Sequence, residues 1–202
     1  MKGYKRYIIG LLIIIYGAYL TKPDLYYFNE MNRAASLPKN TLDPEESTEP
    51  EMPSHYLNHF TLTGIDSNDN GVRDDVDIWI NRVGKTYNER MALREKARTL
   101  NKLLIACDNN DPNSVRALED KNIGDSFCVT FMFLRKPGIE EEWKILYNIV
   151  FNNNKRNCSS YYSNNSSTSV FRDNKEAYEY CVFKIKNLNQ MKSRYENWSK
   201  QQ

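Results

Sequence analysis

Apolar side chains recur three or four positions apart in several segments after residue 73, the spacing that places them on one face of a helix. The series are Val76, Trp79, Ile80, Val83 and Tyr87; Leu93, Ala97, Leu100, Leu104 and Cys107; Trp143, Leu146, Ile149 and Val150; and Tyr178, Cys181, Val182, Ile185, Leu188, Tyr195 and Trp198. The apolar run 127–134 fits a buried helix or a buried strand, and its helical neighbours favour a helix. The sequence therefore predicts a mainly α fold, an irregular helical bundle.

Several boundaries of these helices can be predicted as well. Gly84 is expected to end or bend the first helix, and residues 114–121 are expected to form a short one. The last helix is expected to run from about Asp173 to Ser199. Residues 60–65 differ, because they alternate apolar and polar side chains and include β-branched residues. That pattern predicts a strand-like segment before the helical domain.

Residues 21–55 have the composition of a linker. They contain five of the seven prolines, and their second half is rich in Asp and Glu. Such a segment buries little apolar surface, so we expect a flexible tether. The tether precedes a folded domain of residues 56–202, which is long enough to enclose one hydrophobic core.

Residues 1–20 have the composition of an export signal. Lys2, Lys5 and Arg6 precede an apolar stretch, residues 7–20. As a helix this stretch would extend about 21 Å, less than the ~30 Å hydrocarbon core of a bilayer. Its length favours a cleaved signal peptide, and an uncleaved N-terminal membrane anchor is the alternative. We therefore expect an exported protein, periplasmic or secreted.

The net charge argues against nucleic acid as a partner. The formal charge of the chain is +2, and removing the three basic residues of segment 1–20 leaves −1. General nucleic-acid binding requires a basic surface, which a near-neutral domain of this composition does not predict.

The four cysteines fit the oxidising compartment that export implies: Cys107, Cys128, Cys158 and Cys181. Four cysteines allow three pairings. We favour Cys107–Cys128 with Cys158–Cys181, because each bond would then join two successive helices. A four-cysteine zinc site is the alternative, but no two cysteines have the close spacing typical of such sites.

The segment 66–77 has the spacing of a calcium loop. Side-chain oxygens occur at loop positions 1, 3 and 5, glycine at position 6, and carboxylates again at positions 9 and 12. One short loop can thereby surround a hard cation with oxygen ligands. The alternative is a polar surface turn, for which Asn-Gly is a common signal. The candidate ligands are Asp66, Asn68, Asn70, the carbonyl of Val72, Asp74 and Asp77.

This loop resembles those of dockerins and thrombospondin type 3 repeats. It departs from a regulatory EF-hand in having Asp77 at position 12, where such loops carry the longer Glu, and Arg73 at position 8. The segment 66–76 followed by a helix and cysteines is also similar to small, uncharacterised exported bacterial proteins with a near-identical NGVRDDV segment. That resemblance covers residues 64–83 and implies export and a helical body, but no activity.

Two functions remain for a chain with these features. The first is an exported, calcium-stabilised binding module that acts on a protein partner in the envelope or outside the cell. The second is an envelope hydrolase that uses acidic residues or His55 and His59. The two histidines are four residues apart and could bind a transition metal if their segment were helical, or they could simply be exposed to solvent.

Overall fold

The computed structural model describes residues 22–133, 139–152, 156, 158 and 176–200. These residues are mainly helical and contain no strand, which confirms the predicted fold class. The elements are α2 (Lys22–Ser36), α3 (His55–Phe60), α4 (Asp74–Val83), α5 (Tyr87–Asp108), α6 (Pro112–Met132), α7 (Ile139–Val150), the 3-10 helix η1 (Ala177–Tyr180) and α9 (Leu188–Ser199).

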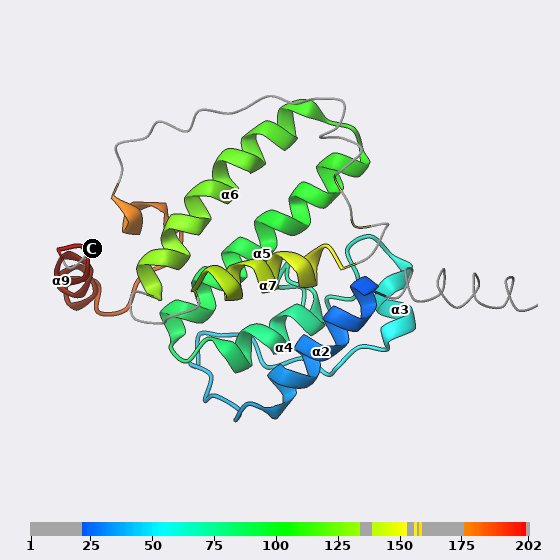
Figure 1. Cartoon of the computed structure of the whole chain (residues 1–202), viewed down its shortest axis with the longest axis horizontal. Helices are drawn as coiled ribbons and strands as arrows, with labels where there is room; N and C mark the ends of the chain where they lie inside the picture. Colours follow the sequence, from blue (N-terminus) through cyan, green and yellow to red (C-terminus); the bar gives the residue numbers. More distant parts are fainter. Residues whose placement is uncertain (1–21, 134–138, 153–155, 157, 159–175, 201–202) are drawn as a thin grey trace, which may run out of the picture.

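Helices α5 and α6 form a long antiparallel pair (Figure 1). The side chain of Thr86 accepts the amide of Glu89, and the Glu89 carboxylate accepts the amide of Thr86, so a capping box begins α5. Asp111 caps α6, and Pro112 occupies its first turn, where a missing N–H costs nothing. The predicted short helix 114–121 and the apolar run from 127 are therefore parts of one helix that ends at Met132.

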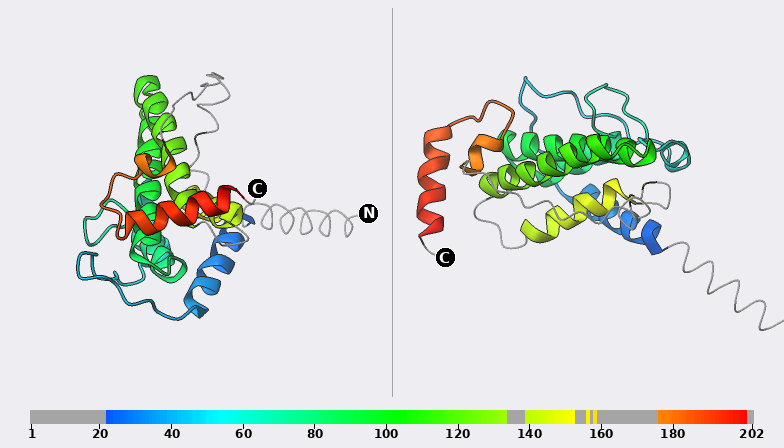
Figure 2. Two further views of the ribbon diagram at one scale, coloured as in Figure 1. Left: turned by 90° about the vertical axis from the view of Figure 1, so that its left-hand side faces the viewer. Right: turned by 90° about the horizontal axis from the view of Figure 1, so that it is seen from above.

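The core lies between the α5–α6 pair and the other helices. Helices α2 and α7 lie on one side of that pair (Figure 2). Most residues of the predicted apolar faces point inward, and Trp79, Ile80 and Leu100 are fully buried, whereas Val182 of the last predicted series is 64% exposed. Gly84 ends α4, as predicted, and its amide donates to the carbonyl of Ile80.

The prediction of a flexible tether is wrong for the part of segment 21–55 that the structure describes. Residues 22–36 form α2, and Tyr27, Met31 and Ala34 on this helix are buried in the core. Residues 37–54 are irregular but attached, because the side chain of Glu46 is fully buried against α5. We call residues 43–49 the acidic segment.

The strand-like segment 60–65 is also not observed. Phe60 ends α3, and the residues after it are irregular. A strand needs a partner strand, and the described part of the chain provides none. The carbonyls of Asn58, Thr61 and Leu62 instead accept hydrogen bonds from the buried guanidinium of Arg156.

Two disulfides join Cys107 to Cys158 and Cys128 to Cys181, with Cα–Cα distances of 5.6 and 5.2 Å. The favoured pairing, Cys107–Cys128 with Cys158–Cys181, is therefore wrong. Cys107 lies at the end of α5, and Cys128 lies 16 residues after the start of α6. That separation is about 24 Å along a helix, whereas a disulfide requires Cα atoms within about 7 Å.

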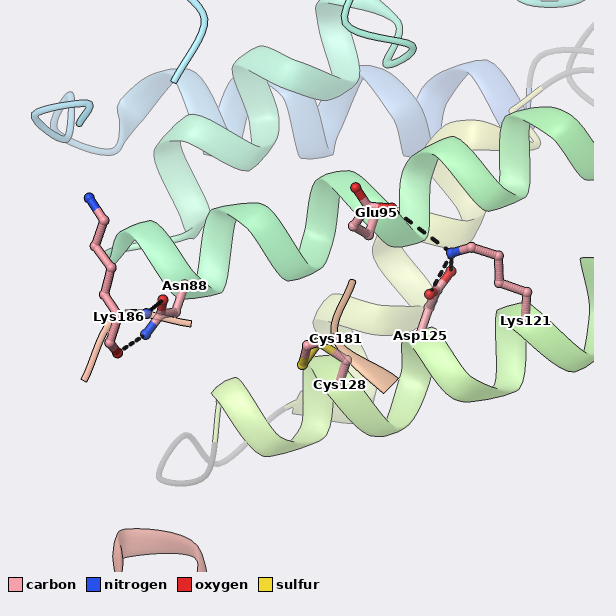
Figure 3. The surroundings of a disulfide bond; sticks show 7 residues. All are labelled: Asn88, Glu95, Lys121, Asp125, Cys128, Cys181 and Lys186. Carbon is pink, nitrogen blue, oxygen red and sulfur yellow. Dashed lines mark hydrogen bonds and ion pairs between the residues drawn. A yellow bond between two sulfur atoms is a disulfide. The ribbon is translucent and has the colours of Figure 1, made fainter. Parts of the chain in front are cut away.

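The last predicted helix is shorter than expected. Residues 173–175 lie outside the described residues, and 176–187, the C-terminal segment, contain only the short η1. The Cys128–Cys181 bond and a pair of hydrogen bonds between the side chain of Asn88 and the backbone of Lys186 hold this segment against α6 and α5 (Figure 3). Asn187 then adopts a positive φ of 60°, and α9 begins after it.

Residues 7–20, the expected signal or anchor, lie outside the described part of the chain. Among the residues that are described, no helix has the length and apolar character needed to cross a bilayer. The two disulfides fit an oxidising, exported environment.

Candidate metal centre

The segment 66–77 forms a closed loop between α3 and the first turn of α4. The carboxylate of Asp66 accepts the amide of Asn70 at 3.1 Å through Oδ1 and the amide of Gly71 at 2.8 Å through Oδ2. Gly71 has a φ of +80°, a conformation that glycine adopts without strain. The first predicted ligand thus folds the loop back over itself.

The next predicted ligands follow the same turn. The amide of Asn70 also lies 3.3 Å from Oδ1 of Asn68, and Oδ1 of Asn70 accepts the amide of Val72 at 2.8 Å. The Val72 side chain has no oxygen and is buried in the core, so this residue can offer the loop only its carbonyl group, as the sequence predicts.

The two predicted ligands on α4, Asp74 and Asp77, bond to different residues of the loop. Asp74 accepts the amide of Ser67 at 2.9 Å. Asp77 lies across the loop from Asn70, whose Nδ2 donates to Oδ2 of Asp77 at 2.9 Å. Both carboxylates are almost completely buried. Hydrogen bonds therefore link position 1 to position 5 and position 5 to position 12 of the loop, whereas position 9 accepts the amide of position 2.

The electrostatics of the loop suit a cation. Burial raises the pKa of Asp74, and the nearby negative charges of Asp66 and Asp75 raise it further, against the hydrogen bonds from Ser67. In the described part of the chain, no three Cys, His, Asp or Glu side chains gather as a metal-ligating group. A calcium ion here would consequently depend on the amide oxygens of Asn68 and Asn70 and on the backbone, which are ordinary calcium ligands.

A buried network next to the loop was not predicted from the sequence. Asp75 is fully buried and accepts hydrogen bonds from Tyr27 of α2, Asn58 of α3 and Arg73, at 2.5, 2.9 and 2.5 Å. Burial would raise the pKa of Asp75, but Arg73 and these hydrogen bonds lower it. The carboxylate at loop position 10 is therefore an anchor for three helices.

Arg73 extends this network to α7. Its guanidinium donates to the carbonyls of Ile149 and Val150, at the end of α7, at 2.7 and 3.4 Å. Arginine at a helix C-terminus satisfies carbonyls that have no partner within the helix. Arg73 passes so close to Gly64 that a β-carbon there would lie 2.1 Å from its Cδ. The residue that departs from the EF-hand pattern thus attaches the loop to the core.

A second buried network joins the loop to the acidic segment. Arg94 of α5 donates to Oδ1 of Asp77 at 2.8 Å and to Glu46 at 2.5 Å. Arg90 donates to both oxygens of Glu46, at 2.7 and 2.5 Å. Oδ1 of Asp77 is thereby held by Arg94, while Oδ2 faces the loop. Nothing in the local spacing of these residues predicts the contact, because Glu46 and Arg94 are 48 positions apart.

The two histidines lie on α3, so their segment is helical. Their ring centroids are 3.9 Å apart. Nδ1 of His59 donates to the carbonyl of His55, and Nε2 accepts from Asn152, at 2.8 and 3.1 Å. Burial, and then nearby positive charges, lower the pKa of His59, which favours the neutral form of the ring. Both ring nitrogens of His59 are therefore already hydrogen-bonded.

Comparisons of the chain with protein-family models, with curated proteins and with solved structures found no match.

Proposed function

We propose that this chain is an exported envelope or secreted protein in which one calcium ion, bound by residues 66–77, stabilises a disulfide-linked helical domain that binds another protein. The observation that carries the proposal is the contact between Asn70 and Asp77 across a loop that Asp66 closes. Hydrogen bonds thus link three residues of a calcium-loop pattern that are at most eleven positions apart.

The ion would be held by the residues that the sequence predicts. Asp66 and Asp77 supply charge, Asn68 and Asn70 supply amide oxygens, and Val72 supplies a carbonyl. Asp74 would complete the site directly or through water. The chemistry of the ion would be neutralisation of carboxylates that otherwise repel one another.

The networks around the loop support a structural role for the ion. Asp75 and Arg73 connect the loop to α2, α3 and α7, and Arg94 connects it to α5 and the acidic segment. An ion that fixes the loop would therefore fix the junction of most of the helices that the structure describes. An ion that binds the folded state alone stabilises it by mass action, by about 2.7 kcal/mol at a hundredfold excess over Kd.

Two observations support export. The disulfides fit an oxidising compartment, and residues 1–20 have the composition of a signal sequence. If residues 7–20 are retained, they would attach the protein to the membrane. The proposed partner is a protein of the envelope or of the extracellular space.

Thermal unfolding of the oxidised protein, in calcium and in EDTA, tests the structural role. We expect calcium to raise the midpoint, and Asp66→Asn to abolish the rise. Asp69→Asn is the matched control, because it removes one carboxylate from the same loop at a position that is not a predicted ligand. Asp69 is exposed and has a φ of 52°, which Asn tolerates. An equal loss in both variants would indicate general charge screening and contradict the site.

A further inference from the structure

On α3 the polar and apolar side chains are placed in the reverse of the usual way for a helix that faces water. Its one asparagine, Asn58, is fully buried, donates to Asp75 and accepts the amide of Ile65. Its large apolar side chains point outward, and Tyr56, Leu57 and Phe60 are exposed by 73, 55 and 67%. Contiguous exposed apolar surface marks contact with a membrane or with another protein.

The apolar surface continues onto α2. Phe28 is 43% exposed, and its ring stacks on His55 with 4.6 Å between centroids. We call Phe28, Tyr56, Leu57 and Phe60 the α3 patch. Ten large apolar side chains are exposed among the described residues, and six of them lie between residues 26 and 60. The exposure is therefore concentrated in this part of the molecule.

The position of the α3 patch, beside a helix that follows the apolar stretch 7–20, indicates what covers it. Helix α2 begins at Lys22, directly after the apolar stretch 7–20. From Lys22 to Phe28 the helix rises about 9 Å. The headgroup layer on each side of a bilayer is about 5–8 Å thick. If residues 7–20 attach to a membrane with Lys22 at the edge of its hydrocarbon core, Phe28 and the neighbouring α3 consequently lie no more than about 9 Å from that edge, at the outer boundary of the headgroups.

We propose that the α3 patch docks on the surface of a phospholipid bilayer. This inference rests on the membrane attachment included in the proposed function. Aromatic side chains are enriched at membrane–water interfaces, where an apolar ring with a polar edge or tip contacts both phases. Docking would orient the domain, with α3 towards the lipid and the C-terminal segment away from it, since the two lie on opposite sides of the molecule (Figure 1).

The charges near the patch identify the kind of lipid. Residues 26–33 and 51–62 contain one Lys or Arg, Arg33, and this side chain pairs with Glu30 at 2.8 Å. Binding to anionic lipid depends on clustered basic residues, and these segments have none. The contact is therefore apolar, occurs on zwitterionic lipid and is insensitive to salt.

Photo-crosslinking of the full-length, oxidised chain in phosphatidylcholine vesicles tests the docking. Tyr56 is replaced by the photoreactive residue benzoylphenylalanine, the vesicles are floated on a gradient and irradiated, and lipid adducts are measured by mass spectrometry. The matched control carries the same residue in place of Val182, which is 64% exposed and lies in the C-terminal segment. We expect several-fold more lipid adduct at position 56 than at position 182, unchanged in high salt.

Each other outcome overturns the proposal and identifies its fault. A chain that floats but gives equal adduct at the two positions is attached to the membrane without docking through α3. A crosslinked dimer would show that a second copy covers the patch, and a crosslink to residues 7–20 would show that the chain covers it itself. A chain that does not float contradicts the membrane attachment as well, while leaving the calcium loop unaffected.

Discussion

Replacing Glu46 by glutamine removes the charge that holds the acidic segment on α5. The side chain of Glu46 is fully buried, and those of Arg90 and Arg94 are 1 and 3% exposed. Burial would raise the pKa of Glu46, but the hydrogen bonds from the two arginines outweigh it and lower the pKa from 4.5 to about 2. The ionised form is therefore strongly favoured in the folded protein.

The two pKa values set the expected magnitude. A difference of about 2.5 corresponds to about 3 kcal/mol at 1.36 kcal/mol per pKa unit. Because the pKa is lowered on folding, this stability is present above pH 4.5 and is lost as the pH falls towards 2. Somewhat less than half of it remains at pH 3. The loss of stability on removing one partner of a buried ion pair is generally about 3–5 kcal/mol, which independently supports this magnitude.

Urea denaturation of the oxidised protein at pH 7 and at pH 3 measures this effect. We expect Glu46→Gln to lower the free energy of unfolding by about 3 kcal/mol at pH 7 and by about half as much at pH 3. Glu45→Gln is the control, because Glu45 is 65% exposed and lies 3.6 Å from Lys186. A penalty below about 1 kcal/mol at pH 7, the value for exposed ion pairs, or one that does not change with pH, would refute the reasoning.

Four further variants have effects that the same unfolding measurement can check. Gly71→Ala should lower the free energy of unfolding by about 1–2 kcal/mol, because alanine is strained at positive φ. Gly64→Ala should lower it more, because its β-carbon would also collide with Arg73. Equal losses in the two variants would contradict that close contact. Removing the Cys107–Cys158 bond by serine substitution at both positions should cost about 4 kcal/mol for a separation of 51 residues, and peptide mapping without reduction should recover this pairing rather than Cys107–Cys128. Tyr27→Phe should cost about 1.5–3 kcal/mol, because it removes a hydrogen bond to a buried carboxylate; no loss would show that this bond contributes nothing.

The sequence predicted most of the helices whose apolar residues recur regularly, but residues 181–187 have that spacing without forming a helix. It failed at α2, where five prolines and many acidic residues in segment 21–55 suggested a tether. Tyr27, Met31 and Ala34 are nevertheless four and three positions apart, and this spacing could have identified the helix. The predicted cysteine pairing was wrong because residues 114–121 and 127–134 were expected to be separate elements. They belong to one helix, α6, which carries Cys128 far from the end of α5 where Cys107 lies.

The candidate site, too, could be predicted from the sequence only in part. The loop residues could be selected from sequence because a calcium loop is a local pattern of oxygens and one glycine. The contacts of Arg94 with Glu46, and of Asp75 with Tyr27 and Asn58, join distant parts of the chain and have no local pattern. Arg73 carried one signal, because a charged residue at an ordinarily aliphatic position of the loop indicates a specific contact.

Direct calcium binding tests the central claim most directly. Isothermal titration of the oxidised protein should extend to about 10 mM calcium, above the 10⁻⁴–10⁻³ M dissociation constants of extracellular calcium modules. We predict one ion per chain in the parent protein and in Asp69→Asn, and none in Asp66→Asn. Absence of binding by the parent protein, or binding that Asp66→Asn leaves intact, would contradict a calcium site in residues 66–77.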